Sequence, residues 1–252
     1  MPGDPFAKLE GPLAGTTRMR LEVVENRALT PAMQQVVLAA PELAGFAYRP
    51  GQDFMLMVAV DGGRPVRRRY TIRDIDAVRG LLTLGIVRHD GGPGERWVAT
   101  ARPGDQIEGI GPRGKIFPAA GAAWHLFAGD FSALPAYFAM AGSLSAGQRA
   151  TVILEVPGAA DEQELKAAAD VELTWLHADG RPPGDPAALA AALAGVTLPP
   201  QAGHAYLAGE AKLVLALREA LAARGLPEGQ MSPKAYWGLG RGNAAHGEPA
   251  RD

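Results

Sequence analysis

The chain has 252 residues, with 25 basic and 27 acidic side chains and a formal net charge of −2. It contains no cysteine, which excludes cysteine-ligated iron–sulfur clusters, cysteine nucleophiles and disulfides. The balanced charge predicts no nucleic-acid partner. The sequence has no apolar run of roughly 18 residues and no apolar signal segment, so we expect a cytoplasmic protein without integral membrane association.

The first half of the chain is a series of short β-rich segments separated by turns rich in glycine and proline. Six strands are expected, at Arg18–Glu25, Met33–Ala39, Asp53–Val60, Val66–Ile72, Leu81–Val87 and Asp105–Ile110. Strands at this spacing are typical of an antiparallel barrel or sandwich. We expect an N-terminal extension over residues 1–16 and a β-barrel domain over residues 17–120.

From about Ala122 the pattern changes to strands that alternate with helices. The expected strands are Trp124–Ala128, Thr151–Val156, Val171–Leu176, His204–Ala208 and Lys234–Trp237. The expected helices are Ala133–Met140, Asp161–Ala169, Ala187–Leu193 and Lys212–Arg224. This alternation predicts a small α/β domain with a parallel sheet over residues 121–252, similar to nucleotide-binding domains.

One glycine-rich stretch, Gly109 to Gly114, matches the dinucleotide fingerprint G-x-G-x-x-G. That motif binds a pyrophosphate only where a helix N-terminus follows it. Here Lys115-Ile116-Phe117-Pro118 follows, so we interpret the stretch as a tight barrel turn. The five histidines have no metal-ligand spacing, and no metal site is predicted.

The densest chemistry in the sequence is the run from Arg67 to Arg73, RRRYTIR. Because side chains alternate along a strand, Arg68 and Tyr70 share one side of it. A guanidinium beside an aromatic ring suits a ligand that combines a phosphate with a flat ring system. A solvated basic edge strand is the alternative interpretation.

Arg68-Arg69-Tyr70-Thr71, followed by Arg73, resembles the flavin-binding signature of the siderophore-interacting proteins, which are ferredoxin-NADP reductase-like ferric-siderophore reductases. Further similar blocks follow in the same order between about Thr17 and Gly242. They are His89 with Gly92, Gly94 and Trp97; Pro103-Gly104-Asp105; Gly111 to Gly114; Gly129-Asp130 with Ala133 to Ala136; Trp175-Leu176; Gly209-Glu210; and Tyr236-Trp237.

The resemblance implies an FAD site on the barrel domain. Arg68 is expected to bind the FAD pyrophosphate, Tyr70 to lie against the isoalloxazine ring, and Thr71 to hydrogen-bond near the flavin N5. Tyr70 and Thr71 are therefore the expected catalytic residues. Arg73 is expected to support the phosphate or the flavin ring. The other expected cofactor-binding residues are His89, Gly92, Gly94 and Trp97. The alternatives are a surface-loop histidine for His89 and packing in the core for Trp97.

The resemblance also implies a nicotinamide and substrate side on the second domain. Its expected residues are Asp130, Ser132, Glu210, Lys234, Trp237 and Arg241. The alternatives are an ordinary turn between strand and helix at Asp130 and Ser132, a helix cap at Glu210, and packing in the core for Trp237. Several positions depart from the family pattern: Phe131-Ser132 replace Glu and Thr, His177-Ala178 stand where an Arg is common, and Gly238 stands where a basic residue is common. These departures lie on the side expected to meet the nucleotide donor and the siderophore, whereas the flavin site keeps the family pattern.

The implied function is that of a flavin-dependent ferric-siderophore reductase, an oxidoreductase in iron acquisition. It would use FAD and take electrons from NAD(P)H, or from ferredoxin as an alternative partner, to release Fe(II). Two other hypotheses are a general NAD(P)H:flavin or electron-transfer reductase and a non-catalytic module that binds flavin or siderophore. The sequence does not identify the siderophore, the donor or the oligomeric state.

Overall fold

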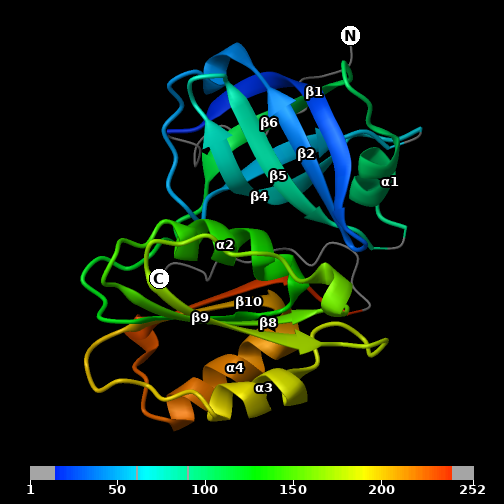
Figure 1. Ribbon diagram of the computed structural model, residues 1–252. Coiled ribbons are helices and arrows are strands. Elements are labelled where there is room, and N and C mark those ends of the chain that lie inside the picture. The colour runs from blue at the N-terminus through cyan, green and yellow to red at the C-terminus, as the bar shows by residue number, and fades with distance from the viewer. Residues whose placement is uncertain (1–14, 61, 90, 240–252) are drawn as a thin grey trace. The chain divides into compact units, whose positions relative to one another are not determined.

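The computed structural model of the protein describes residues 15–60, 62–89 and 91–239, and the chain forms two compact units that divide between Phe117 and Pro118 (Figure 1). Among the helices in these ranges, none is both long and apolar enough to cross a membrane.

Unit 1 is a closed antiparallel barrel, as the sequence predicted. Its strands are β1 (Thr17–Thr30), β2 (Met33–Ala39), β3 (Asp53–Val58), β4 (Val66–Asp76), β5 (Leu81–Val87) and β6 (Gln106–Arg113). They pair in the order β1-β2-β5-β4-β3-β6, and β6 closes the barrel on β1. Alternation along β1 explains the interior: Met19, Leu21 and Val23 are buried while residues between them are exposed.

The stretch Gly109 to Gly114 is not the predicted tight turn, because Gly109 to Arg113 form the end of strand β6. The glycines in this strand are explained by the side chain of Phe54. A Cβ atom on Gly109 or Gly111 would lie 2.4 or 2.3 Å from a carbon of the Phe54 ring, so the ring fills the space that side chains would take. These glycines make room for a core aromatic and do not cradle a phosphate.

We expect Gly111→Ala to destabilise the barrel by about 1–3 kcal/mol, the usual cost of overpacking a core. The combined variant with Phe54→Leu should recover part of this loss, because the smaller side chain vacates the space. Urea unfolding measures both effects. Gly229→Ala is a suitable control, because nothing lies within 4 Å of its added Cβ. Equal midpoints for Gly111→Ala and the control would contradict this interpretation.

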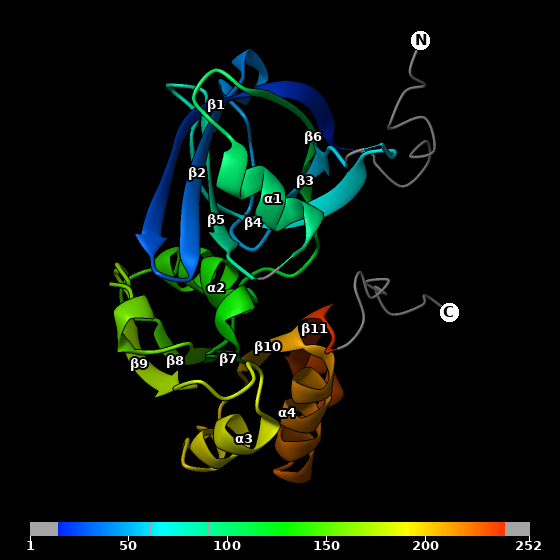
Figure 2. The same ribbon diagram turned by 90° about the vertical axis from the view of Figure 1, so that its right-hand side faces the viewer.

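Unit 1 also contains a helix that the sequence analysis missed, α1 (Pro93–Thr100), which contacts β3 on the barrel (Figure 2). Gly92 is its N-cap and Pro93 occupies the first helical turn, where proline is favoured. A Gly-Pro pair is typical of turns, but it is also a helix-start signal.

Unit 2 has a fully parallel sheet in the order β11-β10-β7-β8-β9, as predicted for an α/β domain. The strands are β7 (His125–Gly129), β8 (Arg149–Val156), β9 (Asp170–His177), β10 (His204–Glu210) and β11 (Met231–Trp237). Helix α2 (Leu134–Gly142) covers one face, and α3 (Pro186–Ala194) and α4 (Ala211–Ala223) cover the other (Figure 1). Leu213, Leu217 and Leu221 of α4 are buried against that second face.

The predicted helix Asp161–Ala169 was wrong. A single 3-10 turn, Ala159–Asp161, is followed by non-helical chain up to β9. The segment is rich in helix-forming residues, but only Leu165 could anchor an apolar face. Isolated helices of this length are marginal without such packing, so tertiary context overrides the local propensity.

Buried aromatic and histidine rings fill part of the space between α2 and the sheet. Tyr206 stacks on Phe127 with ring centroids 4.7 Å apart, and the His125 ring lies 3.3 Å from the Tyr206 hydroxyl. Burial lowers the pKa of both His125 and His204, and the nearby His204 ring lowers the pKa of His125 further. Both histidines are therefore packing residues.

These lowered pKa values predict that the protein loses stability in mild acid. The unfolded histidines take up protons near their ordinary pKa of 6.5, while the folded ones resist protonation. The free energy of unfolding should thus hold above about pH 7 and fall as the pH drops below about 6.5. Urea unfolding at pH 7.5 and 5.5 measures the loss, which should be smaller in His125→Gln. An unchanged pH dependence in that variant would contradict the assignment.

Candidate functional site

On the barrel, three of the expected cofactor residues meet between strand β4 and helix α1. A Cβ atom on Gly94 would lie 2.5 Å from the Tyr70 hydroxyl oxygen, 3.6 Å from Cγ of Arg68 and 3.8 Å from its Cδ. Arg68 and Tyr70 therefore lie on the same side of β4, as the alternation predicted. The absence of a side chain at Gly94 brings the first turn of α1 directly onto them.

Tyr70 is partly buried, and it packs against the barrel core. Burial raises the pKa of its hydroxyl well above the ordinary value; the nearby Glu95 carboxylate adds to this and Arg68 opposes it. The phenol is consequently neutral at physiological pH and can donate a hydrogen bond.

The loop before α1 places His89 and Gly92 beside this cluster. A Cβ on Gly92 would lie 2.9 Å from Cε1 of the His89 ring. Glu95, which the sequence analysis did not single out, accepts a hydrogen bond from the His89 backbone N–H at 3.3 Å and pairs with Arg88 at 3.4 Å. Its position in the first turn, where acidic residues cap helices, could have identified it.

The remaining residues of the Arg67–Arg73 run have different surroundings. Arg69 forms a two-pronged ion pair with the buried Asp53 of β3, with Nε 3.0 Å from Oδ1 and Nη2 close to Oδ2. Thr71 lies opposite Asp53 in the β3–β4 ladder. Arg73 lies at an irregularity in the β4–β5 pairing, and burial together with Arg27 lowers the pKa of its guanidinium. Arg69 is therefore structural.

Trp97 packs against the hydrophobic core of the barrel. This contact favours the core role that the sequence analysis gave as the alternative. The role of Trp97 toward the cofactor stays a prediction.

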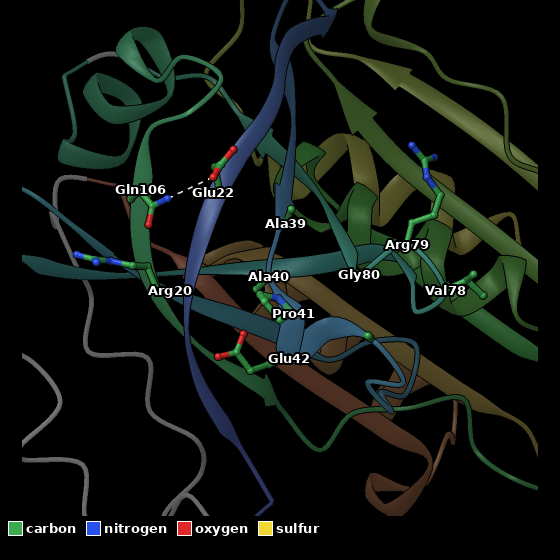
Figure 3. A pocket seen from close by; sticks show the side chains of 11 residues that line it. Arg20, Glu22, Ala39, Ala40, Pro41, Glu42, Val78, Arg79, Gly80 and Gln106 are labelled. Carbon is green, nitrogen blue, oxygen red and sulfur yellow. Dashed lines mark hydrogen bonds between the residues drawn. The ribbon is translucent and has the colours of Figure 1, made fainter.

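A separate hollow of about 580 Å³ lies on the barrel and is lined by residues such as Arg20, Glu22, Glu42 and Arg79 (Figure 3). Glu22 accepts a hydrogen bond from Gln106 at 3.3 Å across its rim. It contains none of the expected cofactor residues, and its two arginines are matched by two glutamates.

In unit 2, Asp130 connects the carboxyl ends of three strands. Its buried carboxylate accepts four hydrogen bonds, from the backbone N–H and hydroxyl of Ser132 at 2.9 and 2.6 Å, the Glu210 N–H at 2.6 Å and the Trp237 indole at 3.0 Å. Burial raises the pKa of Asp130, and these donors oppose the rise. Four of the six residues expected on the nicotinamide and substrate side are thus in one cluster.

Glycine geometry makes this cluster possible. Gly209 has φ +137°, and a Cβ there would lie 2.4 Å from the Asp130 carboxylate. Glu210 follows at the end of β10 and caps α4, accepting from the N–H groups of Lys212 and Leu213 at 2.5 and 3.1 Å. The end of a strand before a helix is where parallel sheets bind ligands.

The other two residues expected on this side are not in the Asp130 cluster as described. Lys234 pairs in register with Ala208, and its ammonium lies 5.5 Å from the centre of the Tyr236 ring. Arg241 lies outside the described residues.

The sequence analysis missed Glu155, near the end of β8. Its side chain is almost fully buried, and Oε1 accepts from the Gly184 N–H at 2.9 Å. Its Oε2 is buried without a hydrogen-bond partner in the described structure. Burial raises the pKa of Glu155, and the Asp130 charge adds to the rise. A signal for Glu155 is present in the sequence, because this glutamate stands alone among the apolar residues of its strand, between Leu154 and Val156.

Comparisons with known proteins agree with this division of the chain. A family model described as siderophore-interacting FAD-binding domain matches residues 56–116. A second, described as siderophore-interacting protein, matches residues 122–240.

Two curated relatives and one solved structure are similar over most of the chain. The ferric vibriobactin reductase of Vibrio cholerae is 31% identical, over 90% of this chain and 92% of its own. The NADPH-dependent ferric-chelate reductase of Escherichia coli is 25% identical, over 86% of this chain and 91% of its own. The crystal structure of a siderophore utilization protein from T. fusca superposes with a TM-score of 0.82 at 34% identity, covering 93% of this chain and 97% of that chain.

Proposed function

The chain belongs to the siderophore-interacting protein family, and on that premise we propose that it is an FAD-dependent reductase that transfers electrons from NAD(P)H to a ferric siderophore and releases Fe(II). The observation that carries the proposal is the Arg68–Tyr70–Gly94 cluster, in a barrel that matches an FAD-binding family model. The V. cholerae and E. coli relatives, both named as ferric reductases, support the reaction.

The residues of unit 1 fit FAD. Without a side chain at Gly94, the first turn of α1 packs directly against Arg68 and Tyr70, and α1 begins there with backbone N–H groups that lack intrahelical acceptors. A helix N-terminus beside a guanidinium suits a pyrophosphate. In this proposal Arg68 and α1 hold the pyrophosphate, Tyr70 lies against the flavin, and His89 and Gly92 lie on the adenine side.

Tyr70 and Thr71 would act on the flavin ring itself. The neutral Tyr70 phenol offers an aromatic surface and a hydrogen-bond donor, and the Thr71 hydroxyl can donate or accept near N5. Arg73 would add positive charge beside the ring or the phosphate. FAD, when bound, supplies the ability to accept two electrons together and release them singly, which iron reduction requires.

The substrate is the iron itself, held by siderophore oxygens. Ferric ion is a hard cation that binds oxygen ligands tightly, and its reduction to Fe(II) weakens those contacts. A basic side chain such as Lys234 would attract an anionic siderophore, and Arg241 would add to this. Ferredoxin as donor and a cytoplasmic location both stay predictions.

Unit 2 would bind the dinucleotide donor at the carboxyl ends of its strands. Asp130 organises this edge by joining β7, β10 and β11, and Ser132 and Trp237 complete it. The name of the E. coli relative supports a nicotinamide dinucleotide as the donor.

The test starts with the protein incubated with FAD, desalted and examined by visible absorption. We expect close to one flavin per chain, bleaching by NADH or NADPH under anaerobic conditions, and Fe(II) capture by ferrozine when a ferric siderophore is added. Arg68→Gln should lose the flavin, whereas Arg67→Gln, an exposed neighbour in the same strand, should keep it. A folded wild-type protein that retains no FAD would refute the proposal.

A further inference from the structure

The segments at and after the carboxyl ends of β8 and β9 are acidic. Residues 155–162 and 177–185 contain one arginine, Arg181, and one histidine, His177. Their acidic residues are Glu155, Asp161, Glu162, Asp179 and Asp185. The whole chain is nearly balanced, at a net charge of −2, so this edge of unit 2 concentrates negative charge.

The two basic side chains of these segments already have carboxylate partners. Nε2 of His177 lies 2.7 Å from Oε1 of Glu162. Nη1 of Arg181 lies 2.6 Å from Oδ2 of Asp185, and its Nη2 donates to the His177 carbonyl at 2.8 Å. The guanidinium is thus held by two groups of its own segment.

The lysine between these segments belongs to the opposite edge of the sheet. The carbonyl of Lys166 lies 3.1 Å from where a Cβ on Gly142 would be, beside the last residue of α2. Because α2 starts at the carboxyl end of β7 and runs back to the start of β8, its last residue is at the amino edge. The backbone of Lys166 therefore lies near the amino edge and not at the carboxyl edge.

Glu155 is a buried acidic residue at the position that contacts the ribose in dinucleotide-binding sheets. Strands β7 and β8 with α2 form a parallel βαβ unit, and Glu155 lies at the end of its second strand, about 25 residues after Asp130. In dinucleotide-binding sheets, an acidic residue at this position accepts a hydrogen bond from the ribose 2′-hydroxyl of NAD. Proteins that bind NADP instead have an arginine nearby, which binds the 2′-phosphate. A hydroxyl is uncharged and can donate to a carboxylate, but a 2′-phosphate is repelled by it.

Resting on the proposed function, we propose that the donor is NADH rather than NADPH, and that Asp185 enforces this choice by keeping Arg181 paired and unavailable to a 2′-phosphate. Asp185 is then a specificity-determining residue. The relative from E. coli, 25% identical, is named for NADPH, so the two proteins would differ in donor.

Asp185→Asn tests the proposal because it removes the charge that holds Arg181 but keeps the helix cap. Asp185 caps α3 by accepting from the Ala187 N–H at 2.9 Å, and asparagine caps helices about as well as aspartate. For flavin reduction we expect the wild type to favour NADH at least tenfold in kcat/KM. The NADPH-to-NADH ratio should rise at least fivefold in Asp185→Asn and return in Asp185→Asn combined with Arg181→Gln.

Binding of NAD⁺ and NADP⁺, measured by calorimetry, provides a readout that does not depend on turnover. We expect the wild type to bind NAD⁺ more tightly than NADP⁺, and we expect Asp185→Asn to shift the ratio of the two dissociation constants toward NADP⁺. Asp170→Asn is the matched control, because it removes an exposed carboxylate from the amino end of β9. It should leave the NADPH-to-NADH ratio unchanged.

A wild type that uses NADPH as well as NADH overturns the proposal, as does an equal response of Asp185→Asn and Asp170→Asn. If neither nucleotide binds or reduces the flavin, this proposal and the donor half of the proposed function both fail. Retained FAD with Fe(II) release from dithionite-reduced protein would leave the rest of the proposed function standing. Selective NAD⁺ binding by a protein without FAD would support this proposal and refute the proposed function.

Discussion

Gly94→Ala is expected to raise the FAD dissociation constant at least tenfold, or about 1.4 kcal/mol, and to leave the desalted protein nearly colourless. The added Cβ would lie 2.5 Å from the Tyr70 hydroxyl, a distance at which one of the two groups must move. Moving the first turn of α1, Tyr70 or both disrupts the surfaces that would hold pyrophosphate and flavin. Titration of the apoprotein with FAD, followed by flavin fluorescence, measures the change.

A second variant separates this local effect from misfolding. Tyr70→Phe removes the hydroxyl that the new methyl group would strike, so the double variant Gly94→Ala with Tyr70→Phe should bind FAD more tightly than Gly94→Ala alone. Gly229→Ala, where the added Cβ meets nothing within 4 Å, is the control for the substitution itself. Wild-type affinity in Gly94→Ala would show that the cofactor lies elsewhere.

Asp130→Asn is expected to destabilise unit 2 by about 2–4 kcal/mol and to lower the rate of flavin reduction by the dinucleotide. The carboxylate accepts from Ser132, Glu210 and Trp237, and an amide would turn an NH₂ group toward one set of these donors. A buried donor without an acceptor is costly, and the ends of β7, β10 and β11 would separate. Thermal unfolding and stopped-flow reduction measure the two effects.

Ser132→Ala removes only one of the four donors and is the graded comparison, with an expected loss of about 1 kcal/mol. FAD affinity should stay near the wild-type value in both variants, because the residues proposed to hold FAD lie in unit 1. Wild-type stability in Asp130→Asn would contradict the inference that the four donors around Asp130 require a carboxylate.

Local sequence patterns were sufficient wherever a side chain's role follows from its own strand. Alternation placed Arg68 and Tyr70 on one side of β4, and the apolar spacing in the second half predicted a parallel sheet. The same reasoning failed at Gly109 to Gly114, because only the facing Phe54 ring explains those glycines. It failed for Asp161–Ala169, where favourable helix propensity has no surface to pack against.

The sequence by itself therefore determined the order of the two units, their strand content and the residue types that suit a flavin and a dinucleotide. Only the tertiary structure decided which distant groups meet: Arg69 with Asp53, and Asp130 with Glu210 and Trp237. The physical reason is the distance along the chain between the residues that interact. Period and propensity are properties of neighbouring residues, whereas the burial and pairing of a charge depend on segments that are up to about a hundred residues away in the chain.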